Sequence, residues 1–129
     1  MAARKPRPII PPNEAAVREL ELYIDNDSRI YNRRLEFELN AARKICRGKY
    51  DATKAPALWA YLADEAAQSY TREHGTPGAR LFTTSDRREV ARSLARDFEQ
   101  RVEGFRSGMY PGDLREEVQA VLSSKSCKR

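Results

Sequence analysis

The sequence predicts an all-α protein, a small bundle of three main helices, the first of them long, with a short C-terminal helix. Apolar residues recur at steps of three and four along each of these segments, and no segment shows the alternation that is typical of a strand. The chain has 129 residues, of which 40% are hydrophobic. This length is enough for one modest core without disulfides. We therefore expect a single helical domain at residues 13–122.

Two terminal segments are expected to lie outside this domain. Residues 1–12 contain four prolines, three basic residues and no acidic residue. Prolines at this density exclude a helix and favour an extended chain. We expect residues 1–12 to form a disordered, proline-rich basic arm, and residues 123–129 to form a basic, flexible tail.

The first helix is expected to span residues 13–47. Asn13 is a good N-cap, and Gly48 is a typical C-terminal stop. Residues 25–28, Asp-Asn-Asp-Ser, are weak helix formers, so the helix either continues through them or breaks and is capped again there. An apolar line that continues across this gap, with Ser28 on it, favours one continuous helix. The line consists of Val17, Leu20, Ile24, Tyr31, Leu35, Leu39, Ala42 and Cys46.

The same segment has two further faces. A basic face lies opposite the apolar line, and a second apolar ridge of Tyr23, Ile30 and Phe37 lies between the two. We interpret the ridge as a second core line covered by the third or fourth helix, with a homodimer or partner surface as the alternative. The candidate binding residues of the basic face and the turn after it are Arg29, Arg33, Arg43, Lys44, Arg47 and Lys49.

The other helices follow from their own periodic patterns. The second is expected to run from about Asp51 to His74, and Thr83 or Thr84 is expected to cap the third. The last, short helix is expected to start at Asp113. The predicted core positions of the three are Leu58, Leu62, Ala66 and Tyr70, then Val90, Leu94, Phe98 and Val102, then Leu114, Val118, Val121 and Leu122.

The two cysteines are expected to be free thiols. Cys46 lies on the apolar line and is expected to act as a small apolar side chain, whereas Cys127 lies in the tail. Free thiols are typical of a reducing compartment, so we expect a cytoplasmic location. No stretch is apolar enough for a membrane span or a secretory signal, and no membrane partner is expected.

No catalytic or metal-binding pattern stands out in the sequence. His74, the single histidine, is expected to cap a helix end, and with two distant cysteines it cannot form a zinc site. Asp25-Asn26-Asp27 resembles the start of a calcium loop, but Arg29 occupies a ligand position and Ile30 stands where glycine is required. The sequence therefore predicts a protein that is not an enzyme and has no cofactor.

The net charge of +5 is unevenly distributed along the chain. Residues 29–54 contain eight basic and three acidic residues, and the arm adds Arg4, Lys5 and Arg7. A rigid basic helix with a basic arm is a workable nucleic-acid interface. A solvated face with ion pairs such as Arg33 to Glu36, or a protein contact surface, is the interpretation that we favour.

Several short stretches carry a resemblance to a known group of proteins. They are Glu-Leu-Glu-Leu-Tyr-Ile-Asp-Asn-Asp at residues 19–27, Gly-Lys-Tyr-Asp at 48–51 and Leu-Trp-Ala-Tyr-Leu-Ala-Asp-Glu-Ala-Ala at 58–67, followed by a Phe-Thr-Thr-Ser-Asp-Arg start to the third helix. In this order they resemble small uncharacterised proteins encoded by tailed bacteriophages and prophages, over about residues 19–105.

The resemblance implies an accessory protein at work in a bacterial host cytoplasm, and it carries no activity or functional residue. We therefore expect a non-enzymatic protein that binds a host or phage macromolecule and modulates it, by inhibition in the leading hypothesis. The alternative is a nucleic-acid-binding protein that uses the basic face and the arm.

Overall fold

The structure is a computed structural model, and it describes residues 11–75, 81–108, 114–125 and 127. Within these residues the chain forms five helices and no strand, so the predicted all-α class is confirmed. Residues 1–10, 76–80, 109–113, 126 and 128–129 lie outside the described part, and with them most of the predicted proline-rich arm. The helices are α1 (Glu14–Asn26), α2 (Ser28–Cys46), α3 (Ala55–His74), α4 (Thr84–Ser107) and α5 (Glu116–Leu122).

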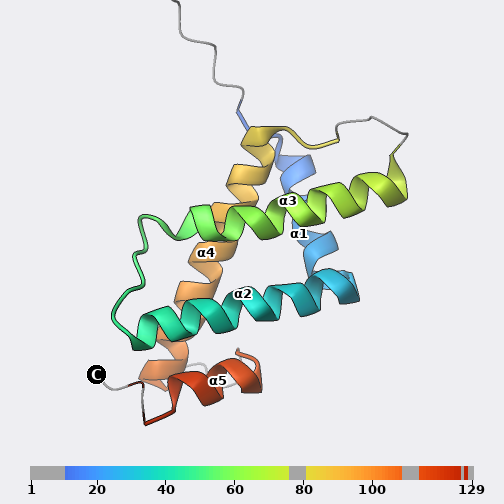
Figure 1. Ribbon diagram of the computed structural model, residues 1–129. Helices are drawn as coiled ribbons and strands as arrows, with labels where there is room; N and C mark the ends of the chain where they lie inside the picture. The colour runs from blue at the N-terminus through green and yellow to red at the C-terminus, as the bar shows by residue number, and fades with distance from the viewer. Residues whose placement is uncertain (1–10, 76–80, 109–113, 126, 128–129) are drawn as a thin grey trace, which may run out of the picture.

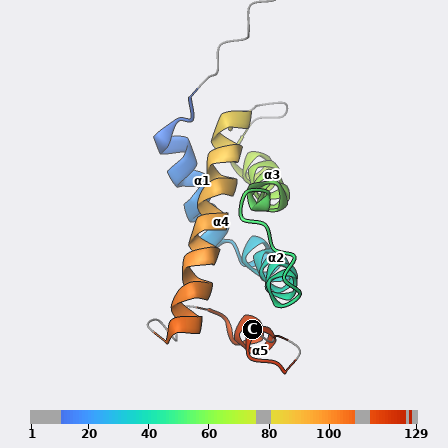
Figure 2. The same ribbon diagram turned by 90° about the vertical axis from the view of Figure 1, so that its left-hand side faces the viewer.

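The helices form two layers that cross at a steep angle. Figures 1 and 2 show α1 and α4 side by side in one layer and the antiparallel pair α2 and α3 in the other. The short α5 lies against α2, at the end of the molecule where α4 finishes. The closest packing between the layers is that of α3 against α4.

The prediction of one long helix over residues 13–47 is wrong. The chain breaks after Asn26, because Asp27 takes an extended backbone conformation and caps a new helix. Its carboxylate accepts hydrogen bonds from the backbone N–H groups of Arg29 and Ile30, both at 3.1 Å. Asp favours this local bonding over a helix interior, so the weak helix formers at 25–28 end one helix and begin the next.

The break also overturns part of the predicted apolar line. Tyr31 is 42% exposed, and Leu35 and Leu39 are only partly buried, because α2 does not continue the direction of α1. Ile30 and Phe37 of the second ridge are instead buried in the core, and Tyr23 is half-buried. The structure thus places the ridge inside the protein rather than on a surface for a partner.

α2 has buried positions over a wide arc, because α3, α4 and α5 all face it. Phe37 faces α3, where its ring lies 6.1 Å from that of Trp59. Cys46 faces the end of α5, with its sulfur 3.6 Å from the carbonyl oxygen of Val121. The positions between these two edges of the arc include Arg34 and Glu38, which turn toward α4.

Trp59 stands at the centre of the core. It is fully buried and lies between Phe37 of α2 and Phe98 of α4, whose ring centroid is 5.5 Å away. Alanines at 63, 66 and 67 of α3 are also buried, and their small side chains allow α4 to approach closely. Aromatic anchors and small residues on α3 therefore explain why this helix has the most extensive packing.

Several helix ends match the predicted signals. Thr83 and Asp86 form a reciprocal capping box at the start of α4. At the end of α2, Gly48 has φ +68°, and the N–H groups of Gly48 and Lys49 donate to the carbonyls of Ile45 and Lys44. This pair of bonds is the Schellman arrangement, which requires a residue in the left-handed region and so favours glycine.

Two predicted helix starts are displaced. α3 begins at Ala55 rather than near Asp51, whose carboxylate instead accepts hydrogen bonds from Thr53 within a turn. These bonds lower the pKa of Asp51, because they stabilise the charged carboxylate. α5 begins at Glu116 with Arg115 as N-cap, and the predicted start at Asp113 lies outside the described residues.

The expectation of two free thiols is wrong, because Cys46 and Cys127 form a disulfide. The bridge joins residues 81 positions apart and attaches Cys127 to the end of α2. The folded chain brings the two sulfurs together, and sequence spacing gives no sign of this pairing. The argument from free thiols to a reducing compartment therefore no longer holds.

Asp27→Ala should test the break between α1 and α2. Loss of the cap leaves two N–H groups at the start of α2 without their acceptor, which should lower the free energy of unfolding by about 1 kcal/mol. Urea denaturation gives this value, and Asp27→Asn is the matched control, because Asn also caps well. Equal stability of Asp27→Ala and the wild type would contradict the capping role.

Leucine truncations should separate the full core from the partly buried face of α2. Leu62 and Leu94 are buried, so Leu62→Ala and Leu94→Ala should each destabilise the protein by about 2–5 kcal/mol. Leu35→Ala should cost less, about 1 kcal/mol, because the side chain is only partly buried. Thermal or urea unfolding of the three variants measures this order, and a larger loss for Leu35→Ala would contradict it.

Candidate functional site

The predicted basic face is divided into two parts by its neighbours. In the first part, the guanidinium of Arg29 lies 2.9 Å from the carboxylate of Glu73 on α3 and 3.3 Å from the hydroxyl of Ser69. Arg33 donates to Glu65 of α3 at 3.0 Å and also pairs with Glu36. These acids offset the charge of Arg29 and Arg33, so this part of the face is a set of ion pairs between α2 and α3.

The second part of the face is an unpaired cluster of cations. In the described part of the chain, no carboxylate lies within ion-pair distance of these side chains, and all of them belong to exposed residues. We call this cluster the basic end. It consists of Arg43, Lys44, Arg47 and Lys49.

Two further cations lie near the basic end. Figure 1 shows that the ends of α2, α4 and α5 meet at one corner of the molecule. Arg106 lies in the last turn of α4, and Lys125 follows α5. The disulfide fixes this corner, because Cys46 is the last residue of α2 and Cys127 follows the end of α5. Six basic residues from three helix ends therefore create a positive potential over one corner of the surface.

The turn that carries Lys49 is held in place. Next to Lys49, the hydroxyl of Tyr50 donates to the carboxylate of Glu99 on α4 at 2.5 Å. Burial, together with this bond to Glu99, raises the pKa of Tyr50 well above its usual value, so the hydroxyl keeps its proton at neutral pH. The Schellman bonds of Gly48 fix the other side of the turn. The basic end is therefore a preformed surface.

A buried charge network lies between α2 and α4. Glu38 is 1% exposed and accepts from Arg101 of α4 at 2.8 Å, while its other neighbour Arg34 lies 3.3 Å away. Arg34, 8% exposed, also reaches Asp97 of α4 at 3.0 Å and Asp25 of α1 at 2.8 Å. Asp97 in turn accepts from Arg101 at 3.0 Å. Two guanidinium groups and three carboxylates thus connect three helices.

The carboxylates determine the ionisation of this network. Burial alone would lower the pKa of Arg101, but the charges and hydrogen bonds of Glu38 and Asp97 outweigh burial and raise it. One carboxylate oxygen of Glu38 and the Nε of Arg34 have no hydrogen bond among the described residues. The network is therefore held by charge pairing as much as by hydrogen-bond geometry.

Sequence reasoning did not identify Arg34, Glu38 or Arg101. Arginine and glutamate are normally exposed, and on the wheel Arg34 and Glu38 fall between the apolar line and the ridge. Their spacing of four, which suits an Arg–Glu pair on one helix face, is the signal that could have indicated them. That signal does not reveal burial, because burial depends on how α4 crosses α2.

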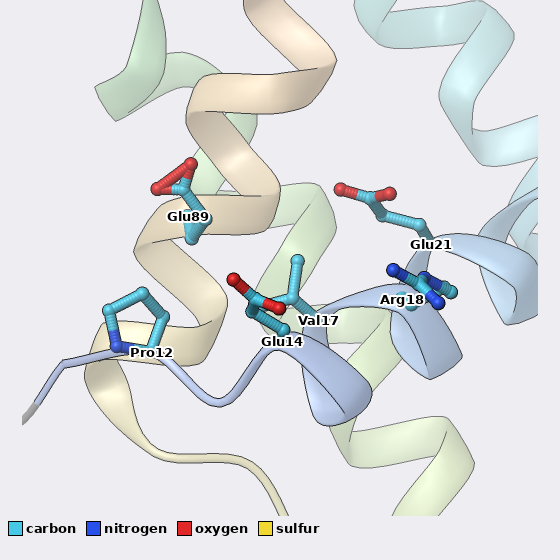
Figure 3. Close-up of a pocket in the computed structure, with 6 residues that line it drawn as sticks. All are labelled: Pro12, Glu14, Val17, Arg18, Glu21 and Glu89. Atoms are coloured by element: carbon cyan, nitrogen blue, oxygen red, sulfur yellow. The ribbon is translucent and has the colours of Figure 1, made fainter.

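A shallow pocket of about 440 Å³ lies between α1 and α4, away from the basic end. Figure 3 shows Glu89 of α4 and the side chains of α1 that line it. Glu89 already pairs with Arg92 at 3.1 Å and Arg96 at 3.5 Å. The lining contains no nucleophile or histidine and offers a recess with mixed charges. Its residues are Pro12, Glu14, Val17, Arg18, Glu21 and Glu89.

The structure also bears on metal binding, on His74 and on membrane spanning. Among the described residues, no group of three or more His, Cys, Asp or Glu side chains is arranged to hold a metal ion. His74, in the last turn of α3, packs its ring 4.5 Å from that of Tyr70. No helix in this part of the chain is both long and apolar enough to cross a membrane.

Comparison with known proteins does not identify the chain. It matches no protein-family model, and neither a curated protein nor a solved structure matches it significantly. Any statement on function therefore depends on the surface and the contacts described above.

Glu38→Gln should destabilise the protein through the buried network. The amide keeps the size of the side chain but removes the charge that Arg34 and Arg101 face, which should cost about 3 kcal/mol. Glu36→Gln is the matched control on the same helix, because its ion pair with Arg33 is exposed and should contribute little to stability. Equal urea midpoints for the two variants would contradict the structural role of Glu38.

Proposed function

We propose that this protein is a non-enzymatic binding protein that attaches through its basic end to an acidic surface of a partner protein and inhibits that partner. The observation that supports the proposal is the contrast within one helix face. Arg29 and Arg33 are paired with acids of the same chain, whereas the cations of the basic end have no such partner among the described residues. Unpaired cations on a preformed surface favour complementary acidic groups on another molecule.

The arrangement of the cations favours a protein partner over nucleic acid. A nucleic acid carries its phosphates along an extended backbone, so binding to it is favoured by cations that follow a continuous track. Here the acids of α3 interrupt the track at Arg29 and Arg33. The exposed ring of Tyr61, 68% accessible, lies one turn before Glu65 on α3 and offers an aromatic contact of the kind common in protein interfaces.

The point where the proline-rich arm joins the domain lies far from the basic end. The backbone N–H of Asn13, where the arm joins α1, donates to Asp86 at the start of α4. The basic end lies near the other end of this 24-residue helix, about 36 Å away along its axis. The nucleic-acid hypothesis needs the arm and the basic face to form one continuous interface. The arm instead joins the domain near one end of α4, and the basic end lies near the other.

The setting that we propose is the bacterial cytoplasm during phage infection, as the sequence resemblance implies. In that setting a host protein with an acidic surface is the leading class of target, and a phage protein is the other. A homodimer through the ridge receives no support, because Ile30 and Phe37 are buried.

The experiment is capture of partners from bacterial lysate with tagged protein, followed by binding measurements with the purified partner. Arg43→Glu/Arg47→Glu should weaken binding at least about tenfold, because both substitutions place acids against the acidic partner. The control is Arg18→Glu/Arg88→Glu, which changes the net charge equally at two exposed arginines without ion pairs among the described residues. Equal losses for both double variants would contradict the assignment of the basic end.

The second candidate function is nucleic-acid binding, which the positive potential of the corner supports. Nuclease treatment distinguishes it from protein binding. If a nucleic acid is the partner, capture should disappear after nuclease treatment. Binding of a labelled DNA duplex should then fall steeply as salt rises, with a slope that Arg43→Glu/Arg47→Glu reduces. Capture of one protein that survives nuclease treatment and depends on the basic end would exclude this function as the main one.

A further inference from the structure

The two sulfurs of the disulfide have different electrostatic surroundings. A guanidinium nitrogen of Arg106 lies 3.5 Å from the sulfur of Cys127 and can stabilise a thiolate there. Cys46 is the last residue of α2, at the negative end of the helix dipole, and its sulfur lies 3.6 Å from the carbonyl oxygen of Val121. Both of these features disfavour negative charge on Cys46. Cys127 is therefore the better leaving group of the two.

The bridge also closes a structural strap. α5 has seven residues and packs against α2. Its start is held by Arg115. The guanidinium of Arg115 donates to the backbone carbonyl of Tyr31 at 2.6 Å and lies over the aromatic ring of Tyr31. Its end is held by the disulfide, through Cys127. A helix this short is not stable alone, so it depends on these two anchors and on its buried apolar residues.

We propose that the Cys46–Cys127 disulfide is a thiol–disulfide exchange site that reacts with dithiols, and that its reduction releases α5 from α2. Both cysteines are partly exposed, so a small dithiol can approach. This inference does not depend on what the basic end binds.

The reaction proceeds in two balanced steps. A thiolate of the dithiol attacks the sulfur of Cys46, a new S–S bond forms, and the old bond breaks with Cys127 leaving as a thiolate beside Arg106. The second thiol of the dithiol, as a thiolate, then attacks the mixed disulfide at the dithiol's own first sulfur, and Cys46 leaves. The dithiol is oxidised to its disulfide, the protein gains two thiols, and the two protons of the dithiol end on Cys46 and Cys127.

Release of α5 is tested by hydrogen exchange on the full chain, oxidised and after treatment with dithiothreitol. We expect the amides of residues 118–122 to lose protection by about tenfold or more on reduction, while those around Trp59 and Phe98 keep theirs. Cys127→Ser should show the reduced pattern without reagent. Unchanged protection of α5 would overturn the strap, and so would loss of protection throughout the protein.

The direction of attack is tested with a monothiol, glutathione, followed by peptide mapping. The mixed disulfide should be found on Cys46, and its appearance on Cys127 would overturn the assignment. Arg106→Gln should slow reduction by about threefold or more, because the leaving thiolate loses its cation. Arg96→Gln, an exposed arginine elsewhere on α4, is the matched control, and equal rates for the two variants would contradict the role of Arg106.

Discussion

The buried pairing of Glu38 with Arg34 and Arg101 is the constraint on which the arrangement of the two layers depends. The backbones of α2 and α4 do not approach closely, and long charged side chains fill the space between them. A carboxylate as buried as Glu38 is tolerated only where cations face it, so a different crossing of α2 over α4 would leave it uncompensated. Apolar contacts alone would allow α2 to slide or rotate with less penalty. The charges therefore specify how the layers meet, while Trp59 and its aromatic neighbours supply the burial.

The break at Asp27 is a condition for this network. Asp25 and Arg34 are nine residues apart, and in one continuous helix that separation is about 13 Å along the axis. Their observed contact of 2.8 Å requires the chain to turn between them. Asp27 produces the turn by capping α2, and the turn also lets α1 lie beside α4 while α2 joins α3 in the other layer. One short polar segment thus sets both the packing of the layers and the partner of a buried arginine.

Those features of the fold that depend on local chemistry could be predicted from the sequence. Thr83, Gly48 and Gly75 mark helix ends through capping and backbone preference, and Leu62, Val90 and Phe98 follow the helical period into the core. Whether the first helix breaks at residues 25–28 could not be decided from the sequence. An apolar line on a helical wheel carries no information on a change in the direction of the helix axis. The disulfide and the charge network could not be predicted for a related reason, because they join positions that only the tertiary fold brings together. The basic face was predicted only in part. Its cations were identified from the sequence, but the acids of α3 that pair with Arg29 and Arg33 were not.

The basic end and the disulfide share one corner of the molecule, and this has an energetic consequence. The cations there raise the local concentration of anionic thiolates and stabilise the thiolate that leaves beside Arg106. Oxidation holds α5 on α2 and keeps Lys125, which follows α5, beside the basic end. An acidic partner that binds this preformed corner therefore favours the oxidised form. By reciprocity, reduction of the disulfide must weaken the binding of that partner by the same free energy.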